Sequence, residues 1–167
     1  MNERPPKVVY DCMVFLQGLI KERGPAVECL ALVENDSVEL FISKVVLREI
    51  SEVLTRPELQ SRYPLLTSER VARLIEVMQR KAILIDPVPP IFSYSRDPKD
   101  EPYINLAVAA GADCIVSRDT DLLDLMTGYM AECKEFRQRF RLLKVIDPVS
   151  FLEAVGRQLQ ATANDEE

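Results

Sequence analysis

The sequence predicts an α/β fold, in which a central parallel sheet of about five strands lies between two layers of helices (a three-layer α/β/α arrangement). Short apolar runs rich in β-branched residues, which are typical of buried strands, alternate with longer segments of helical spacing. Such an alternation favours a parallel sheet covered on both faces. Because 167 residues fit one compact domain, we expect a single domain over residues 1–167, with its core over about residues 7–152 and a frayed tail over residues 160–167.

Each element is predicted from its local pattern. The predicted strands are residues 7–11 (KVVYD), 38–43 (VELFIS), 82–86 (AILID), 114–117 (CIVS) and 142–147 (LLKVID). The predicted helices are residues 14–23 and 26–34, which Gly24-Pro25 separates, and then 44–54, 68–82, 100–112 and 147–159. Ser43, Thr67 and Asp147 are predicted helix N-caps, and Gly111 is a predicted helix end. The proline-rich stretch 85–102 is predicted to be a long irregular loop, and such loops are often functional.

Composition excludes several classes of enzyme and site. The chain has no histidine, which excludes Ser-His-Asp and Cys-His hydrolases, histidine-ligated zinc and nucleases with a histidine acid or base. The net charge of −6 argues against nucleic-acid binding through overall charge, but is compatible with a local basic rim around an acidic site. The scattered cysteines (Cys12, Cys29, Cys114 and Cys133) predict reduced core residues of a cytoplasmic protein. Because no apolar run approaches the roughly 18–20 residues that span a bilayer, and MNERPPK lacks the apolar part of a signal peptide, we expect no membrane association.

Carboxylates fall at the predicted carboxyl ends of the strands, where open α/β sheets bind ligands. Asp11 closes the first strand, Glu49 lies about two turns into the helix after the second strand, Asp100 opens the helix at 100–112, and Asp119 and then Asp121 follow the fourth strand. Crowded carboxylates repel one another unless a hard cation joins them, and oxygen ligands suit Mg²⁺ or Mn²⁺. Such a cation supports phosphodiester hydrolysis without histidine. Taken singly, each of these residues also fits an ordinary place in a fold: a strand-end turn, a solvated helix face, a helix N-terminus, or the cap of a short helix over 119–126.

Three stretches carry a resemblance to a known family. They are VVYDCMVFLQGL at residues 8–19, SKVVLREISEVLTRP at 43–57 and DPKDEPYINLAVAAGADCIVSRDTDLL at 97–123. They resemble the PIN domain family (PilT N-terminus-like), which includes VapC-like toxins of toxin–antitoxin systems and other metal-dependent ribonucleases, and the likeness extends from about residue 7 to residue 152. The resemblance implies a metal-binding, catalytic tetrad of Asp11, Glu49, Asp100 and Asp119, with Ser117 as the accompanying hydroxyl residue. Asp97 competes weakly with Asp100, which keeps the family's spacing to the apolar residues of its helix.

One departure from the family's pattern lies directly after Asp11. The family typically has Thr or Ser and then Asn at this point, where the chain has Cys12 and Met13. A hydroxyl and an amide there would orient the first carboxylate or its waters, and loss of such contacts costs ~10–100-fold in metal affinity or activity. We therefore expect weakened or substrate-restricted activity, and the intact acidic set argues against its complete loss.

Basic residues that flank the motifs are candidate RNA contacts, although each also fits an ordinary surface charge. They are Lys44, Arg48, Arg56, Arg96, Lys99 and Arg118. A second basic cluster, over residues 134–144, is interpreted as a solvated helix face in preference to a binding patch.

The leading hypothesis is a Mg²⁺- or Mn²⁺-dependent endoribonuclease of single-stranded RNA that acts as the toxin of a toxin–antitoxin pair. The resemblance implies an antitoxin protein and a second copy of the chain, as a homodimer, as partners. The alternative is a non-enzymatic PIN-like module that binds RNA or protein, because of Cys12-Met13. A receiver-like Mg²⁺-binding signalling domain fits less well. Such a domain needs an acidic pair after the first strand, where this chain has Asp11 alone. It also needs a Lys after the last strand, whereas Lys144 lies inside the predicted last strand, before Val145. A dinucleotide-binding fold lacks its G-x-G-x-x-G after the first strand.

Overall fold

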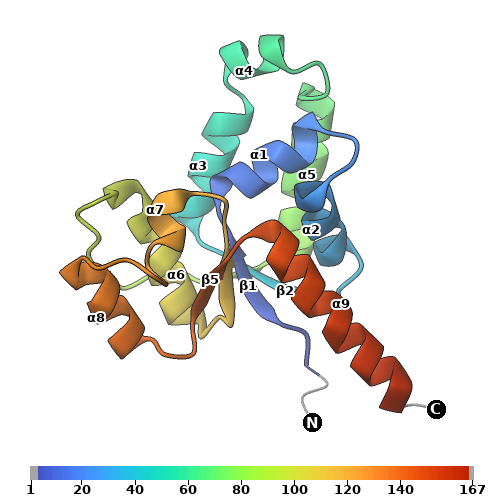
Figure 1. Ribbon diagram of the computed structural model, residues 1–167. Helices are drawn as coiled ribbons and strands as arrows, with labels where there is room; N and C mark the ends of the chain where they lie inside the picture. The colour runs from blue at the N-terminus through green and yellow to red at the C-terminus, as the bar shows by residue number, and fades with distance from the viewer. Residues whose placement is uncertain (1–3, 166–167) are drawn as a thin grey trace.

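The computed structural model describes residues 4–165, and its centre is a sheet of five parallel strands (Figure 1). The strands are β1 (Lys7–Tyr10), β2 (Glu39–Ile42), β3 (Ile83–Leu84), β4 (Cys114–Val116) and β5 (Lys144–Ile146), in the spatial order β3-β2-β1-β4-β5. Val8 of the central strand β1 pairs with Leu40 of β2 on one side and with Cys114 of β4 on the other. The predicted α/β class with a parallel sheet is therefore confirmed, and all five predicted strand segments contain a strand.

Helices connect the strands and lie on both sides of the sheet. They are α1 (Cys12–Ile20), α2 (Pro25–Glu34), α3 (Lys44–Leu54), α4 (Pro57–Arg62), α5 (Ser68–Lys81), the 3₁₀ turn η1 (Pro98–Asp100), α6 (Glu101–Ala110), α7 (Thr120–Leu123), α8 (Ala131–Arg139) and α9 (Pro148–Asp165). Helix α6 packs against β1, β2 and β4, whereas α2 contacts α1, α5 and α9 on the other side of the sheet (Figure 1). Among the helices of residues 4–165, none is long and apolar enough to cross a membrane.

The helix ends follow from local chemistry. The hydroxyls of Ser43 and Thr67 accept hydrogen bonds from Val46 N (3.1 Å) and Arg70 N (3.2 Å), as N-caps do. Helix α6 ends at Gly111, whose φ of 62° is a left-handed conformation that glycine adopts without strain. These ends agree with the predictions from sequence.

Several boundaries differ from those predicted. Helix α1 begins at residue 12 because the side chain of Asp11 caps it. Helix α9 continues to Asp165, so residues 160–165 are helical where a frayed tail was predicted, and Gln160, Ala161 and Ala163 are good helix formers. Residues 166–167 lie outside the described part. Helix α4 was not predicted, and α8 ends at Arg139, short of the basic cluster's end at residue 144.

Two polar side chains of α6 hold the proline-rich stretch against the domain. Asn105 Oδ1 accepts hydrogen bonds from the backbone N of Ile91 (3.0 Å) and of Phe92 (2.8 Å), and Asn105 Nδ2 donates to Phe92 O (3.1 Å). The carboxylate of Glu101 accepts from Tyr94 N (2.8 Å). The ring of Phe92 packs edge-on against Phe136 of α8, with centroids 5.6 Å apart. The predicted irregular loop is therefore ordered by the same helix that carries Asp100 at its start.

Candidate metal centre

Asp11 and Ser117 meet at the carboxyl ends of the neighbouring strands β1 and β4. The backbone N of Asp11 donates to Val116 O (3.2 Å), which continues the pairing of these strands by one residue. One carboxylate oxygen of Asp11 accepts from Val14 N (3.1 Å), and the other accepts a hydrogen bond from the hydroxyl of Ser117. Both side chains are buried, with exposed fractions of 5% for Asp11 and 0% for Ser117. Two donors therefore fix the Asp11 carboxylate at the start of α1.

Asp119 is tied to this pair through its backbone. Its N–H donates to Ser117 Oγ (2.9 Å), so the one hydroxyl connects the two aspartates. One oxygen of the Asp119 carboxylate accepts from Asp121 N (2.8 Å), which caps α7. The second oxygen of the Asp119 carboxylate accepts no hydrogen bond from the described residues.

Three carboxylates come together beside this network. Asp97, Asp100 and Asp119 each present an oxygen, and these oxygens lie within 4.8 Å of one another. Asp97 stands at the start of η1 and Asp100 at its end, where the chain enters α6. Asp100 is buried, with an exposed fraction of 7%, and its Oδ2 has no hydrogen-bond partner among the described residues.

Burial and mutual repulsion make these carboxylates hard to ionise. Burial, followed by the charge of Asp119 and then that of Asp97, raises the pKa of Asp100 from 3.8 to about 8. Burial also raises the pKa of Asp11 to about 6, although the hydrogen bonds from Ser117 and Val14 act in the opposite direction. In the absence of a cation, the site therefore favours binding a proton near neutral pH.

These residues fit a divalent cation. Asp100 Oδ2 is a buried acceptor without a donor, which costs free energy unless a ligand satisfies it. An oxygen-only set of carboxylates with no histidine or thiolate is the chemistry that Mg²⁺ and Mn²⁺ prefer. We conclude that the carboxyl ends of β1 and β4 form a candidate divalent-metal site.

Glu49, which was predicted to belong to the tetrad, lies outside the three-carboxylate cluster. It is half-buried on α3, and burial raises its pKa, whereas the nearby Tyr103, Lys99 and Arg56 lower it. Glu49 nevertheless lies near the acidic site, because the charges of Glu49 and of Asp11 both raise the pKa of the Cys12 thiol. Burial raises the pKa of the Cys12 thiol to about 12, which keeps this residue neutral.

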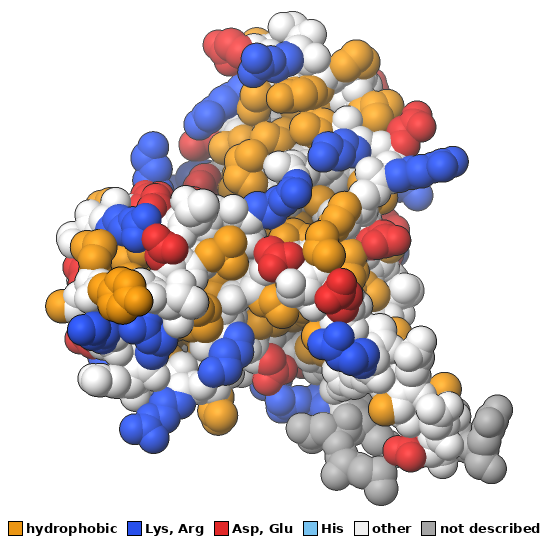
Figure 2. All heavy atoms as spheres, viewed as in Figure 1, with side chains coloured by type: hydrophobic (Ala, Val, Ile, Leu, Met, Phe, Trp, Pro, Cys, Tyr) orange, Lys and Arg blue, Asp and Glu red, His pale blue; other side chains and the backbone are white. Residues whose placement is uncertain are grey.

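Several predicted RNA contacts are already engaged with protein groups. Arg96 forms ion pairs with Asp121 (2.7 Å) and with Asp124 (2.6 Å), and acidic and basic side chains lie next to one another around α7 (Figure 2). Arg118 donates to Gln17 Oε1 (2.7 Å).

Lys44 pairs with Asp86 at 3.2 Å. Lys99, Arg48 and Arg56 are exposed, and the structure gives them no ion pair within the described chain. In the second basic cluster, Arg137 donates to the carbonyls of Leu125 and Gly128, so it holds the loop before α8.

The sheet and the acidic site define a class of proteins, the α/β domains with carboxylates gathered at the strand ends. Residues 7–121 match the PIN domain family. The chain belongs to the PIN domain family, whose members are typically metal-dependent nucleases. It is also similar to an uncharacterized protein of Methanocaldococcus jannaschii, with 29% identity over 147 residues, which cover 88% of this chain and 90% of that protein.

Asp97, which the sequence presents only as a weak competitor of Asp100, lies in the same cluster as Asp100 in the structure. The turn at Pro98 makes this possible, because Asp100 N donates to Asp97 O (3.0 Å) and folds the three-residue segment back on itself. The Asp-Pro-x-Asp spacing itself was the available signal.

Proposed function

We propose that the chain is a metal-dependent endoribonuclease that hydrolyses phosphodiester bonds of single-stranded RNA at a Mg²⁺ or Mn²⁺ site. The observation that carries the proposal is the unpartnered, buried oxygen of Asp100 within a cluster of three carboxylates. Asp97, Asp100 and Asp119 would hold the cation, with Asp11 beside them. Membership of the PIN domain family supports the same class of reaction.

The residues of the chain supply a fixed acidic frame. The buried hydroxyl of Ser117 donates to the Asp11 carboxylate and accepts from the backbone N–H of Asp119, so this one group fixes the spacing of the two aspartates. A divalent cation in such a frame lowers the pKa of a bound water and stabilises charge on phosphate oxygens. With no histidine in the chain, the carboxylates and this cation are the groups on which we base hydrolysis.

A cavity of about 420 Å³ supports a single strand as substrate. It lies past the ends of β2 and β3, where Ser43 and Asp86 line it, and Pro98 and Pro102 on either side of Asp100 form another part of its wall. Val45, which is 59% exposed, completes an apolar wall. We propose that an unpaired base packs against this wall, which a base inside a duplex cannot reach.

Exposed basic side chains near the site support contact with phosphates. Lys99 lies next to Asp100 in the chain, and both Lys99 and Arg56 are close enough to Glu49 to lower its pKa. We propose these two residues, with Arg48 on the same helix as Glu49, as the phosphate contacts. Arg96 is a weaker candidate because Asp121 and Asp124 hold it.

The experiment compares cleavage of one labelled RNA as a single strand and as a duplex, with Mn²⁺, Mg²⁺ or a chelator. We expect metal-dependent cleavage of the single strand, and loss of cleavage in Asp100→Asn and Asp11→Asn. Intact RNA with the wild-type protein and Mn²⁺ would refute the proposal. RNA binding without cleavage would favour the alternative, a binding module in which Cys12-Met13 no longer supports turnover.

The predicted partners are part of this proposal. An antitoxin protein would cover the acidic cleft, and a second copy of the chain would form a homodimer. Light scattering of the purified chain measures its oligomeric state, and co-expression with the protein encoded by a neighbouring gene tests for an antitoxin. A monomer that no such protein inhibits would contradict the partners and leave the nuclease proposal standing.

A further inference from the structure

Two buried polar side-chain atoms lack a hydrogen-bond partner among the described residues, and both belong to the start of α6. They are Asp100 Oδ2 and the hydroxyl oxygen of Tyr103. The charge of Asp11 acts on both Asp100 and Tyr103, so both side chains face the same part of the fold. Asp100 Oδ2 belongs to the candidate metal site, whereas the Tyr103 hydroxyl is not part of the three-carboxylate cluster.

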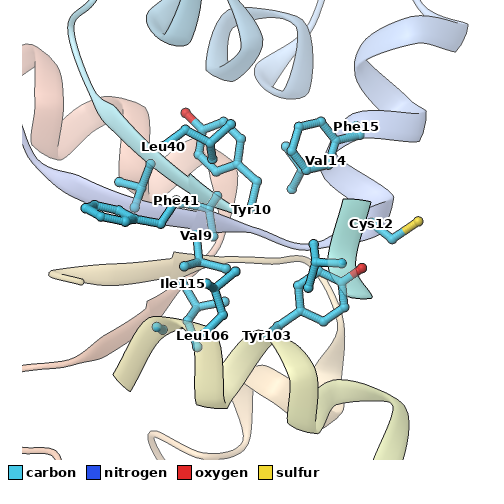
Figure 3. Packing of buried hydrophobic residues seen from close by; sticks show 14 of the residues in the cluster. Val9, Tyr10, Cys12, Val14, Phe15, Leu40, Phe41, Tyr103, Leu106 and Ile115 are labelled. Atoms are coloured by element: carbon cyan, nitrogen blue, oxygen red, sulfur yellow. The ribbon is translucent and has the colours of Figure 1, made fainter. Parts of the chain in front are cut away.

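The Tyr103 side chain reaches from α6 towards the beginning of α1, on the side where Cys12 lies (Figure 3). It is 2% exposed, so water does not satisfy its hydroxyl. Cys12, Glu49 and Asp11 all lie near the hydroxyl, and together with burial, which is the largest effect, they raise the pKa of Tyr103. The phenol therefore stays neutral and carries a proton to donate.

Glu49 is the acceptor that the surroundings of the hydroxyl favour. Tyr103 lies close enough to Glu49 to lower the pKa of that carboxyl as a hydrogen-bond donor does, although the two groups do not form a hydrogen bond of ordinary length and angle. The Asp11 carboxylate is already held by Val14 N and by the Ser117 hydroxyl. A cysteine sulfur is only a weak acceptor. Lys99 and Arg56 act on Glu49 as nearby charges, and neither forms an ion pair with it within the described chain.

We propose that Tyr103 is a positioning residue whose hydroxyl donates to the Glu49 carboxylate and holds it towards the acidic cluster when a divalent cation is bound. The inference rests on the proposed function and adds to it a residue that no sequence motif indicated. It also explains how Glu49, which lies outside the three-carboxylate cluster, contributes to that site. Through Tyr103, α6 carries both a metal-binding carboxylate and the group that orients Glu49 of α3.

The test measures Mn²⁺ affinity by calorimetry for the wild-type protein, Tyr103→Phe, Glu49→Gln and the double variant. Tyr103→Phe removes only the hydroxyl, and we expect it to weaken Mn²⁺ binding about 10-fold, the lower end of the effect of contacts that orient a metal ligand. In the Glu49→Gln background, the same change should have no further effect. Thermal unfolding of the metal-free protein should show little loss of stability in Tyr103→Phe, because the removed hydroxyl makes no hydrogen bond of ordinary geometry within the described residues.

Tyr10→Phe is the matched control. Its hydroxyl is also buried but donates to Cys29 O (2.8 Å), away from the acidic site. This variant should lose stability and keep its Mn²⁺ affinity, which is the opposite of the pattern expected for Tyr103→Phe.

The outcomes separate this inference from the proposed function. Unchanged Mn²⁺ affinity in Tyr103→Phe, or an equal loss in the wild-type and the Glu49→Gln backgrounds, would overturn the positioning role while RNA cleavage by the wild-type protein stands. If the wild-type protein binds Mn²⁺ and shows the expected coupling but cleaves no RNA, the inference stands and the nuclease proposal fails. A wild-type protein that does not bind Mn²⁺ would overturn both.

Discussion

Replacing Asp100 by Asn should change how the stability of the metal-free protein depends on pH. Burial and the charge of Asp119 raise the pKa of Asp100 in the folded protein from 3.8 to about 8. A group with a raised pKa in the folded state stabilises the fold fully below its pKa in the unfolded chain, and this contribution is lost as the pH rises towards the folded value. The metal-free wild-type protein should therefore lose stability between about pH 4 and pH 8.

The magnitude follows from the size of the pKa shift. A shift of about four pKa units corresponds to about 6 kcal/mol at most, at about 1.4 kcal/mol per unit. Because Asp97 and Asp119 are only half-buried, water reaches the cluster and screens its charges, which reduces the expected loss to about 2 kcal/mol. For a chain of this length, that change lowers the melting temperature by about 4–8 °C.

The assay is thermal unfolding from pH 4.5 to pH 8.5, with a chelator or with Mn²⁺. Asp100→Asn cannot ionise at this position, so it should melt above the wild-type protein at pH 8.5 and close to it at pH 4.5. Mn²⁺ should stabilise the wild-type protein at high pH and leave the variant nearly unchanged. Asp165→Asn, at an exposed position near the end of α9, is the control and should follow the wild-type curve. Equal pH profiles for Asp100→Asn and the wild-type protein would refute the reasoning.

Three further changes test other parts of the site. Ser117→Ala removes the hydroxyl that donates to the buried Asp11 carboxylate. It should lower the free energy of unfolding by about 1–3 kcal/mol and weaken Mn²⁺ binding ~10–100-fold. An unchanged Mn²⁺ affinity in calorimetry would contradict this role. Val45→Asp places a charge on the apolar wall of the cavity and should weaken binding of single-stranded RNA, measured by fluorescence anisotropy, without changing Mn²⁺ affinity. Lys99→Ala should reduce RNA affinity more than Arg96→Ala, because Arg96 already pairs with two aspartates; the reverse order would show that these ion pairs open on binding.

The sequence by itself determined the order of the five strands and the N-caps Ser43 and Thr67 of the helices α3 and α5. Alternating apolar runs and helical segments predict the parallel sheet, because strands buried on both faces must be apolar throughout. Asp11, Ser117 and Asp119 could be placed close together for the same reason: Asp11 and Ser117 directly follow neighbouring strands, Asp119 follows two residues later, and parallel strands end at the same edge of the sheet.

Only the tertiary structure decided which polar groups are satisfied and by what. Asp97 joins the cluster because a 3₁₀ turn brings it back beside Asp100, a local geometry that the Asp-Pro-x-Asp spacing allows but does not require. Arg96 flanks the motif in the sequence, yet Asp121 and Asp124 hold it in the fold. Tyr103 looks like an ordinary apolar residue of a helix, and its proposed role depends on a buried hydroxyl that lies near Glu49 and makes no hydrogen bond of ordinary geometry within the described residues. Such long-range pairings depend on how helices pack against one another across the sheet, and the spacing of residues within one helix does not contain that information.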